Sequence, residues 1–313
     1  MIAMLAKTGL QLLVLLLVAP LVSGFIKTSK ARLQNRRGPG VLQVYRDVHK
    51  LLRKGMVIPD TASWIFSAAP YVVFATSVLV GLMIPTIATD APLSLFGGVL
   101  AVVYLLALGR FFLALGGLDT GSSFGGLGSS REMTISAIAE PAMMLSIFTV
   151  ALAANSTNLS EMAHLALSQS WRFLAPSQML AFSGLFIVLI AETGRIPVDN
   201  PATHLELTMI HEAMALEYSG PYLALIEWGA SVKQLVLMTL LVNTFFPFGL
   251  SSSWAASDLA AGLLYYFMKL LVLASCIVLV ETTNAKMRLF RVPELLAVAF
   301  ILGALALIST FLF

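Results

Sequence analysis

The stretch "FLAPSQMLAFSGLFIVLIA", residues 173–191, is nineteen residues long and carries no charge. A helix of that length can cross a hydrocarbon core of roughly 30 Å. The next eight residues, "ETGRIPVD" (192–199), contain a glutamate, an arginine and an aspartate. The sequence therefore predicts a membrane-spanning helix that ends abruptly in a charged loop.

Similar apolar runs fill the rest of the chain. Hydrophobic residues make up 58% of it and charged residues 11%, with a mean hydropathy of +0.91, far from the average of soluble domains. We predict an all-α polytopic membrane protein with about eight transmembrane helices in a single domain over residues 1–313. Besides 173–191, the expected spans are residues 9–26, 61–89, 91–118, 133–154, 221–246, 259–280 and 295–313.

The basic residues predict the orientation of these spans, because Lys and Arg are retained preferentially in short cytoplasmic loops. Nine of the nineteen lie within residues 27–54. Arg131, Arg195 and Lys286 fall in other loops on the same side of the predicted bundle. Both termini should then face away from the cytoplasm. The expected cytoplasmic loops are residues 27–60, 119–132, 195–220 and 281–294.

Several chemistries find no support in the sequence. Cys276 is the only cysteine, so the chain cannot hold an iron–sulfur cluster or a cysteine-rich zinc site. His204 and His211 would lie about 10 Å apart along a helix, too far to bind one ion together. The glycine-rich run 116–132 lacks the GK[ST] of a phosphate loop and reads as a flexible turn between spans. We expect no metal, no cofactor and no nucleic-acid partner, since the net charge of +3 follows from membrane topology.

Besides Arg110, four charged residues fall inside the predicted spans. A charge within a membrane is expensive and usually faces a cavity or a partner, so these residues are candidates for moving protons or other ions. The alternative is a structural ion pair, for example between Glu140 and a neighbouring helix, or between Lys269 and one of the glutamates. The four residues are Glu140, Glu227, Lys233 and Lys269.

The segment after the charged motif predicts an amphipathic interfacial helix over residues 201–219, within the loop 195–220. Pro201 suits the first position of a helix, and Gly220 can end one. At about 100° per residue, Glu206 and Glu217 fall on the apolar side of this helix. Unless the helix breaks near residue 208, both carboxyl groups should point inward, where they can exchange protons near neutral pH.

These motifs resemble a known family. "AETGRIPVD" (191–199), followed at residue 217 by "EYSG", is similar to the eight-span membrane subunit of respiratory complex I, the first NADH dehydrogenase subunit. Longer segments look more like the corresponding subunit of membrane-bound energy-converting [NiFe] hydrogenases, the formate hydrogenlyase and hydrogenase-4 group. They are "ARLQNRRGPGVLQVYRD" (31–47), "RFFLALGGLDTGSSFGGLGSSRE" (110–132) and "EWGASVKQL" (227–235).

The resemblance implies a non-catalytic subunit in the inner membrane of a prokaryote. Its cytoplasmic loops would dock the peripheral hydrogenase and iron–sulfur subunits, and its buried acids would begin a proton path toward antiporter-like membrane subunits. The implied docking residues are Arg32, Arg36, Arg37, Tyr45, Arg46 and Arg195. The implied relay starts at Glu192, Asp199, Glu206 and Glu217 and continues through Glu140, Glu227, Lys233 and Lys269.

Two other functions stay open at this point. A complex I type subunit would use the charged loop to line a quinone chamber. This chain departs from the family pattern there, because it reads "PATHLEL" (201–207) where more acids are usual, which leaves His204 as a possible replacement proton carrier. A stand-alone ion transporter is less favoured, since the sequence shows no inverted repeat.

Overall fold

The computed structural model describes residues 2–168, 175–200, 209–251 and 255–312. The regular secondary structure of this part of the chain is all helical, with two isolated bridges and no strand. Two short 3-10 helices, Ser94–Phe96 and Leu289–Arg291, accompany the α-helices. The α-helices are α1 (Ile2–Leu33), α2 (Gln43–Leu52), α3 (Trp64–Met83), α4 (Val99–Asp119), α5 (Ser123–Ala153), α6 (Leu159–Ser168), α7 (Pro176–Glu192), α8 (His211–Ala215), α9 (Gly220–Phe245), α10 (Ala256–Thr283) and α11 (Val292–Leu312).

The prediction of a polytopic all-α membrane protein is confirmed. Seven helices are long and apolar enough to cross a membrane, and α7 is a shorter apolar helix of 17 residues. At 1.5 Å per residue, α7 is about 25 Å long, near the lower limit for a span. These eight helices coincide with the eight expected runs, and α2, α6 and α8 are short helices between them.

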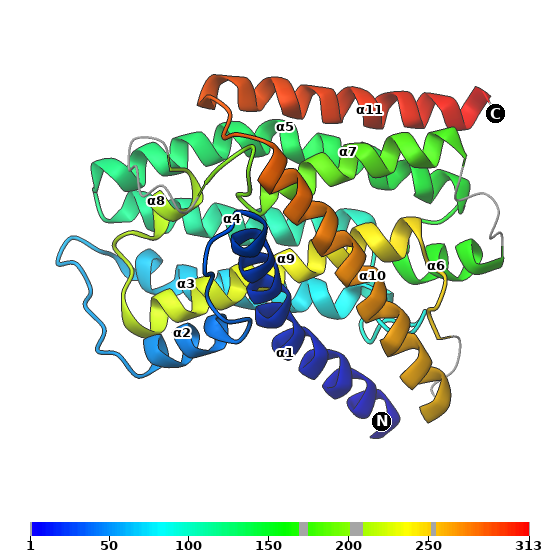
Figure 1. Cartoon of the computed structure of the whole chain (residues 1–313), viewed down its shortest axis with the longest axis horizontal. Helices are drawn as coiled ribbons and strands as arrows, with labels where there is room; N and C mark the ends of the chain where they lie inside the picture. The colour runs from blue at the N-terminus through cyan, green and yellow to red at the C-terminus, as the bar shows by residue number, and fades with distance from the viewer. Residues whose placement is uncertain (1, 169–174, 201–208, 252–254, 313) are drawn as a thin grey trace.

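Helix α9 lies in the middle of the bundle (Figure 1). The most apolar part of α9 is 72% buried, against 22% for α11 at the edge. Helices α1 and α10 cross it obliquely, α3 and α4 pack together on one side, and α5, α7 and α11 pack together on the other. The two chain ends lie toward the same end of the bundle, as an even number of crossings requires.

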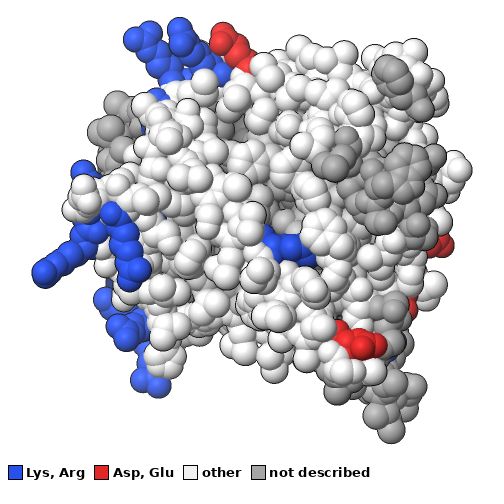
Figure 2. Space-filling view, turned by 45° about the vertical axis from the view of Figure 1, so that its right-hand side comes forward, with Lys and Arg blue, Asp and Glu red and all other residues white. Residues whose placement is uncertain are grey.

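The opposite end carries most of the cations. We call it the basic end; it is formed by the loops 34–42, 53–63, 193–200 and 284–288. Figure 2 shows most of the visible Lys and Arg side chains gathered along one side of the molecule, beside a broad surface with few charges. Charged residues at one end of the bundle and apolar side chains around its sides are typical of a protein that spans a bilayer.

The glycine-rich run 116–132 is not the flexible turn that the sequence predicted. Only residues 120–122 separate α4 from α5, so the expected cytoplasmic loop 119–132 is wrong. A Cβ atom on Gly125 would lie 2.2 Å from the carbonyl oxygen of Gly117, and one on Gly117 would lie 2.9 Å from Ser129 Oγ. The glycines therefore allow the two helices to approach closely.

The interfacial helix expected over residues 201–219 is also wrong in its described part. Residues 201–208 lie outside the described residues, Met209 and Ile210 are not helical, and α8 is only five residues long. After α8 the chain turns at "EYSG", where Tyr218 stacks on Phe66 with ring centroids 4.0 Å apart. The Tyr218 hydroxyl donates to the Phe66 carbonyl, and burial raises the pKa of this phenol well above its usual range. This motif fixes the start of α9 against α3.

Helix α1 contains Pro20, which has no N–H to donate to the carbonyl of Leu16. The indole of Trp228 on α9 donates to that carbonyl instead, at 3.3 Å. The hydroxyl of Tyr45 on α2 donates to the neighbouring carbonyl of Leu17. Tyr45 thus holds α2 against α1, which differs from the docking role expected for it.

Candidate functional site

A buried arginine lies at the centre of the largest charge cluster. Arg110, on α4, is 5% exposed and faces three carboxylates from two other helices. Its guanidinium lies 2.9 Å from Glu192 on α7, 3.4 Å from Glu140 on α5 and 3.8 Å from Glu132 on α5. Because the cost of burying a charge falls when an opposite charge is near, these four groups stabilise one another.

The cluster extends in two directions from Arg110. Lys233 on α9 lies 2.8 Å from the second oxygen of Glu192, so Glu192 bridges two cations. On the other side, His211 Nε2 on α8 lies 3.4 Å from Glu132 Oε1. The chain of groups therefore runs from α8 through α5, α4 and α7 to α9. We call these six residues, His211, Glu132, Arg110, Glu140, Glu192 and Lys233, the Arg110 network.

The charges of the Arg110 network do not balance. Within the described part of the chain it contains three carboxylates against one arginine and one lysine, a formal charge of −1 when His211 is neutral. One additional proton, on His211 or on a carboxylate, makes it neutral. An unbalanced charge is costly in a buried site unless it is compensated.

A second cluster lies around Glu281, near the end of α10. This carboxylate is buried and lies 2.9 Å from Lys30 and 2.7 Å from Arg195. Arg195 also donates to Gln234 Oε1 on α9 at 2.8 Å, and Ser23 on α1 donates to the same oxygen at 3.0 Å. The Arg195 side chain is 12% exposed. Arg195 thus joins α9 to α10, and its partners Gln234 and Glu281 each contact α1. This differs from the docking role predicted for Arg195.

Asp199, at the end of the charged motif 192–199, accepts three hydrogen bonds. One carboxylate oxygen accepts from Lys286 Nζ and from the backbone N–H of Asn200, both at 2.8 Å. The other accepts from the backbone N–H of Ile210 at 3.0 Å. Asp199 is therefore fully engaged in fixing the two ends of the segment 200–210 to each other and to the α10–α11 connection. Among the described residues, no hydrogen bond or ion pair joins Asp199 to the Arg110 network.

Lys269 lies far from these clusters, toward the other end of the bundle. Its ammonium donates to Asn243 Oδ1 at 2.8 Å and to the carbonyl of Phe246 at 3.1 Å. Asn243 in turn donates to the carbonyls of Pro85 and Thr86. The alternative of an ion pair with Glu227 or Glu140 is not found among the described residues, and Lys269 caps the carboxyl end of α9.

The remaining relay candidates separate in the structure. Glu227 is exposed on α9 and is not paired with Lys233; the charged groups that act on it are Lys27 and Asp47. Glu217 is exposed, so the inward orientation expected for it is wrong. Glu206, like His204, lies outside the described residues. The four other docking candidates are exposed at the basic end: Arg32, Arg36, Arg37 and Arg46.

The architecture and the clusters can now be compared with known proteins. The chain matches the family described as NADH dehydrogenase over residues 6–312. It belongs to the NADH dehydrogenase family. It is 37% identical over 304 residues to formate hydrogenlyase subunit 4 of Escherichia coli (strain K12), with 96% of each chain covered. It is 36% identical over 297 residues to hydrogenase-4 component C of the same strain, covering 95% of this chain and 92% of that one.

A solved structure shares the fold of this NADH dehydrogenase family member. It is the membrane-bound sulfane sulfur reductase (MBS), an archaeal respiratory membrane complex, with a TM-score of 0.86 and 18% identity over 98% of this chain and 99% of that one. The resemblance to the complex I subunit, and to the formate hydrogenlyase and hydrogenase-4 group within that family, is confirmed.

Sequence reasoning about this family member missed the centres of both clusters. Arg110 was visible as a charge inside a span but had no assigned role, and Glu132 was hidden in a run read as a loop. Glu281 was placed in a loop, although it lies within α10. The useful signal was that several predicted spans each contain a charged residue. A charge inside a membrane is costly unless it has a partner, so such residues are expected to contact one another.

Proposed function

We propose that this chain is the membrane-anchor and coupling subunit of a complex I-like energy-converting hydrogenase in the inner membrane of a prokaryote. Its basic end faces the cytoplasm and docks the hydrogenase and iron–sulfur subunits. Its buried charges link their redox chemistry to the translocation of protons or sodium ions, toward antiporter-like membrane subunits. The chain itself contributes no cofactor.

The Arg110 network is the observation that carries this proposal. It connects α8, beside the charged loop, with α9 in the middle of the bundle, through side-chain contacts between 2.8 and 3.8 Å. Its formal charge of −1 gives it capacity for one proton. Among the described residues, neither His211 Nδ1 nor Glu132 Oε2 has a hydrogen-bond partner, so both atoms are available to bind one.

The position of Glu140 gives the network a route out of the bundle. Its side chain is 29% exposed, whereas those of Glu132 and Glu192 are 3% exposed. A proton bound in the buried part can therefore reach the protein surface at α5 through this carboxyl group. That surface is where we place contact with another membrane subunit.

The basic end fits the docking role. The exposed arginines Arg32, Arg36, Arg37 and Arg46 form no salt bridge among the described residues, so their charges remain available to a partner. A peripheral subunit with an acidic face would complement them.

Sealed vesicles that contain the intact complex provide the test of coupling. We expect Glu140→Gln and Glu132→Gln to preserve assembly and electron transfer with artificial donors, while ion pumping per electron falls sharply. Glutamine keeps the shape of the side chain but cannot carry the proton. Glu217→Gln, on an exposed carboxylate outside the network, is the matched control and should pump normally. Normal pumping in both network variants would contradict the proposal.

A further inference from the structure

An apolar layer lies directly behind the Arg110 network, on the side away from the basic end. Helices α4 and α7 run toward the basic end, so residues three or four positions earlier lie one turn farther from it. Helices α5 and α9 run the other way, so the later residues lie farther. One turn beyond the charged groups on these four helices stand Leu106, Met143, Val188, Leu189 and Leu237, all 4% exposed or less.

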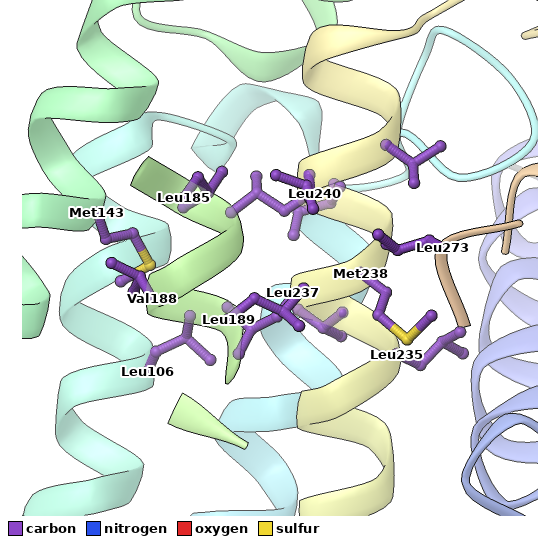
Figure 3. Packing of buried hydrophobic residues seen from close by; sticks show 14 of the residues in the cluster. Leu106, Met143, Leu185, Val188, Leu189, Leu235, Leu237, Met238, Leu240 and Leu273 are labelled. Atoms are coloured by element: carbon purple, nitrogen blue, oxygen red, sulfur yellow. The ribbon is translucent and has the colours of Figure 1, made fainter. Parts of the chain in front are cut away.

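These five side chains come together in space. Figure 3 shows Leu106, Met143, Val188, Leu189 and Leu237 projecting into the region between their four helices. All belong to one continuous hydrophobic core. Each charged group on these helices thus has an apolar neighbour on the same helix face, because residues three and four apart lie above one another.

The second charge cluster has the same arrangement. One turn farther from the basic end than Gln234 lies Met238, and one turn beyond Glu281 lies Ile277, both fully buried. Gln234 donates to the sulfur of Met238 at 3.9 Å. The apolar layer therefore continues behind both clusters.

Polar side chains reappear beyond this layer. Thr239 shares a hydrogen bond of 2.7 Å with Tyr266 on α10. Asn243, one turn farther along α9, accepts a hydrogen bond from Lys269 Nζ at 2.8 Å. Six residues separate Lys233 from Thr239, about 9 Å along the helix. Water needs several polar partners to occupy a buried site, and the layer between these groups offers none from its side chains.

We infer that Leu106, Met143, Val188, Leu189 and Leu237 form a permeation seal that closes the Arg110 network toward the far side of the membrane. The network then exchanges protons with the basic end and sideways through Glu140, and the described residues of this chain form no complete transmembrane path. The inference rests on the proposed function only in taking the network to bind exchangeable protons.

The seal can be tested by passive proton permeability. Vesicles containing the assembled complex receive a pH step without any electron donor, and an internal pH dye follows the decay. We expect Leu237→Asn and Leu106→Asn, two independent positions, to accelerate the decay several-fold, because an amide gives water a partner within the layer. Leu237→Met, which keeps the layer apolar, should retain the original rate.

Two further variants identify the route. Adding Glu192→Gln to Leu237→Asn should slow the leak, since the proton then lacks a carboxylate next to the opened layer. Leu108→Asn, on the exposed face of α4, should leave the rate unchanged. An unchanged rate in both assembled layer variants, or an equal leak in Leu108→Asn, would overturn the inference. Because no electron donor is present, a leak in the layer variants supports the seal even if Glu140→Gln pumps normally and the coupling proposal fails.

Discussion

Replacing single carboxylates of the Arg110 network should have very unequal effects on stability. Glu192 is buried and contacts two cations, at 2.9 Å from Arg110 and 2.8 Å from Lys233. Among the described residues, Glu140 forms an ion pair with Arg110 alone, at 3.4 Å, and its side chain is partly exposed. Removing either charge makes the network formally neutral, so the difference between the two variants comes from local contacts alone.

The structure sets the expected magnitudes. Glu192→Gln leaves Lys233 without a carboxylate among the described residues, and breaking a buried ion pair costs about 3–5 kcal/mol. Glu140→Gln removes a longer, partly solvated contact from an arginine that keeps two other carboxylates, which should cost less than about 1 kcal/mol. At about 2 °C for each kcal/mol, the unfolding temperature should fall by roughly 6–10 °C in the first variant and by less than about 2 °C in the second.

Thermal unfolding of the purified complex, followed by intrinsic fluorescence, measures both values. The double variant Glu192→Gln with Lys233→Met should recover part of the loss, because it removes the uncompensated ammonium as well as the carboxylate. Equal falls for Glu192→Gln and Glu140→Gln would refute this reasoning. So would a double variant whose loss is the plain sum of the two single losses.

Two other predictions concern the basic end. Changing Arg36 and Arg37 together to Glu should release the peripheral subunits while the chain stays inserted, as judged by co-purification. Changing both to Lys should retain these subunits. If neither double variant releases them, lipid headgroups are left as the partners of these cations. Asp199→Ala should speed hydrogen exchange at the Ile210 amide by about tenfold or more, since a hydrogen bond to a charged acceptor contributes about 1.5–3 kcal/mol. Asp60→Ala, in an exposed loop, is the control, and unchanged exchange at Ile210 would contradict the role of Asp199.

The membrane spans could be predicted because each depends only on the local sequence. An apolar run of about twenty residues with at most two charges has few alternatives to a membrane helix, and helices overlap all eight expected runs. The prediction of a flexible turn for the glycine-rich run 116–132 was wrong for a nonlocal reason. Its glycines serve the contact between α4 and α5, whereas glycine taken alone favours a turn.

The candidate site was predictable in its members but not in its connections. Glu140 and Lys233 were identified because charges inside spans are expensive, and Glu192 because the charged motif resembles that of the family. Their partners depend on which helices are neighbours and on how each helix is rotated, which a single sequence does not contain. The inward direction assigned to Glu217 failed because it assumed one unbroken helix through residue 219, whereas α8 ends at Ala215.

The backbone hydrogen bond that is missing at Pro20 has a consequence for how sequences of this family can vary. The carbonyl of Leu16 needs a donor only because position 20 is proline, and the Trp228 indole supplies it from a helix more than two hundred residues away in sequence. A relative with an ordinary residue at position 20 could satisfy the same carbonyl within its own helix and would lose the selective reason for an indole at position 228. Proline and tryptophan at these positions should therefore be inherited or lost as a pair.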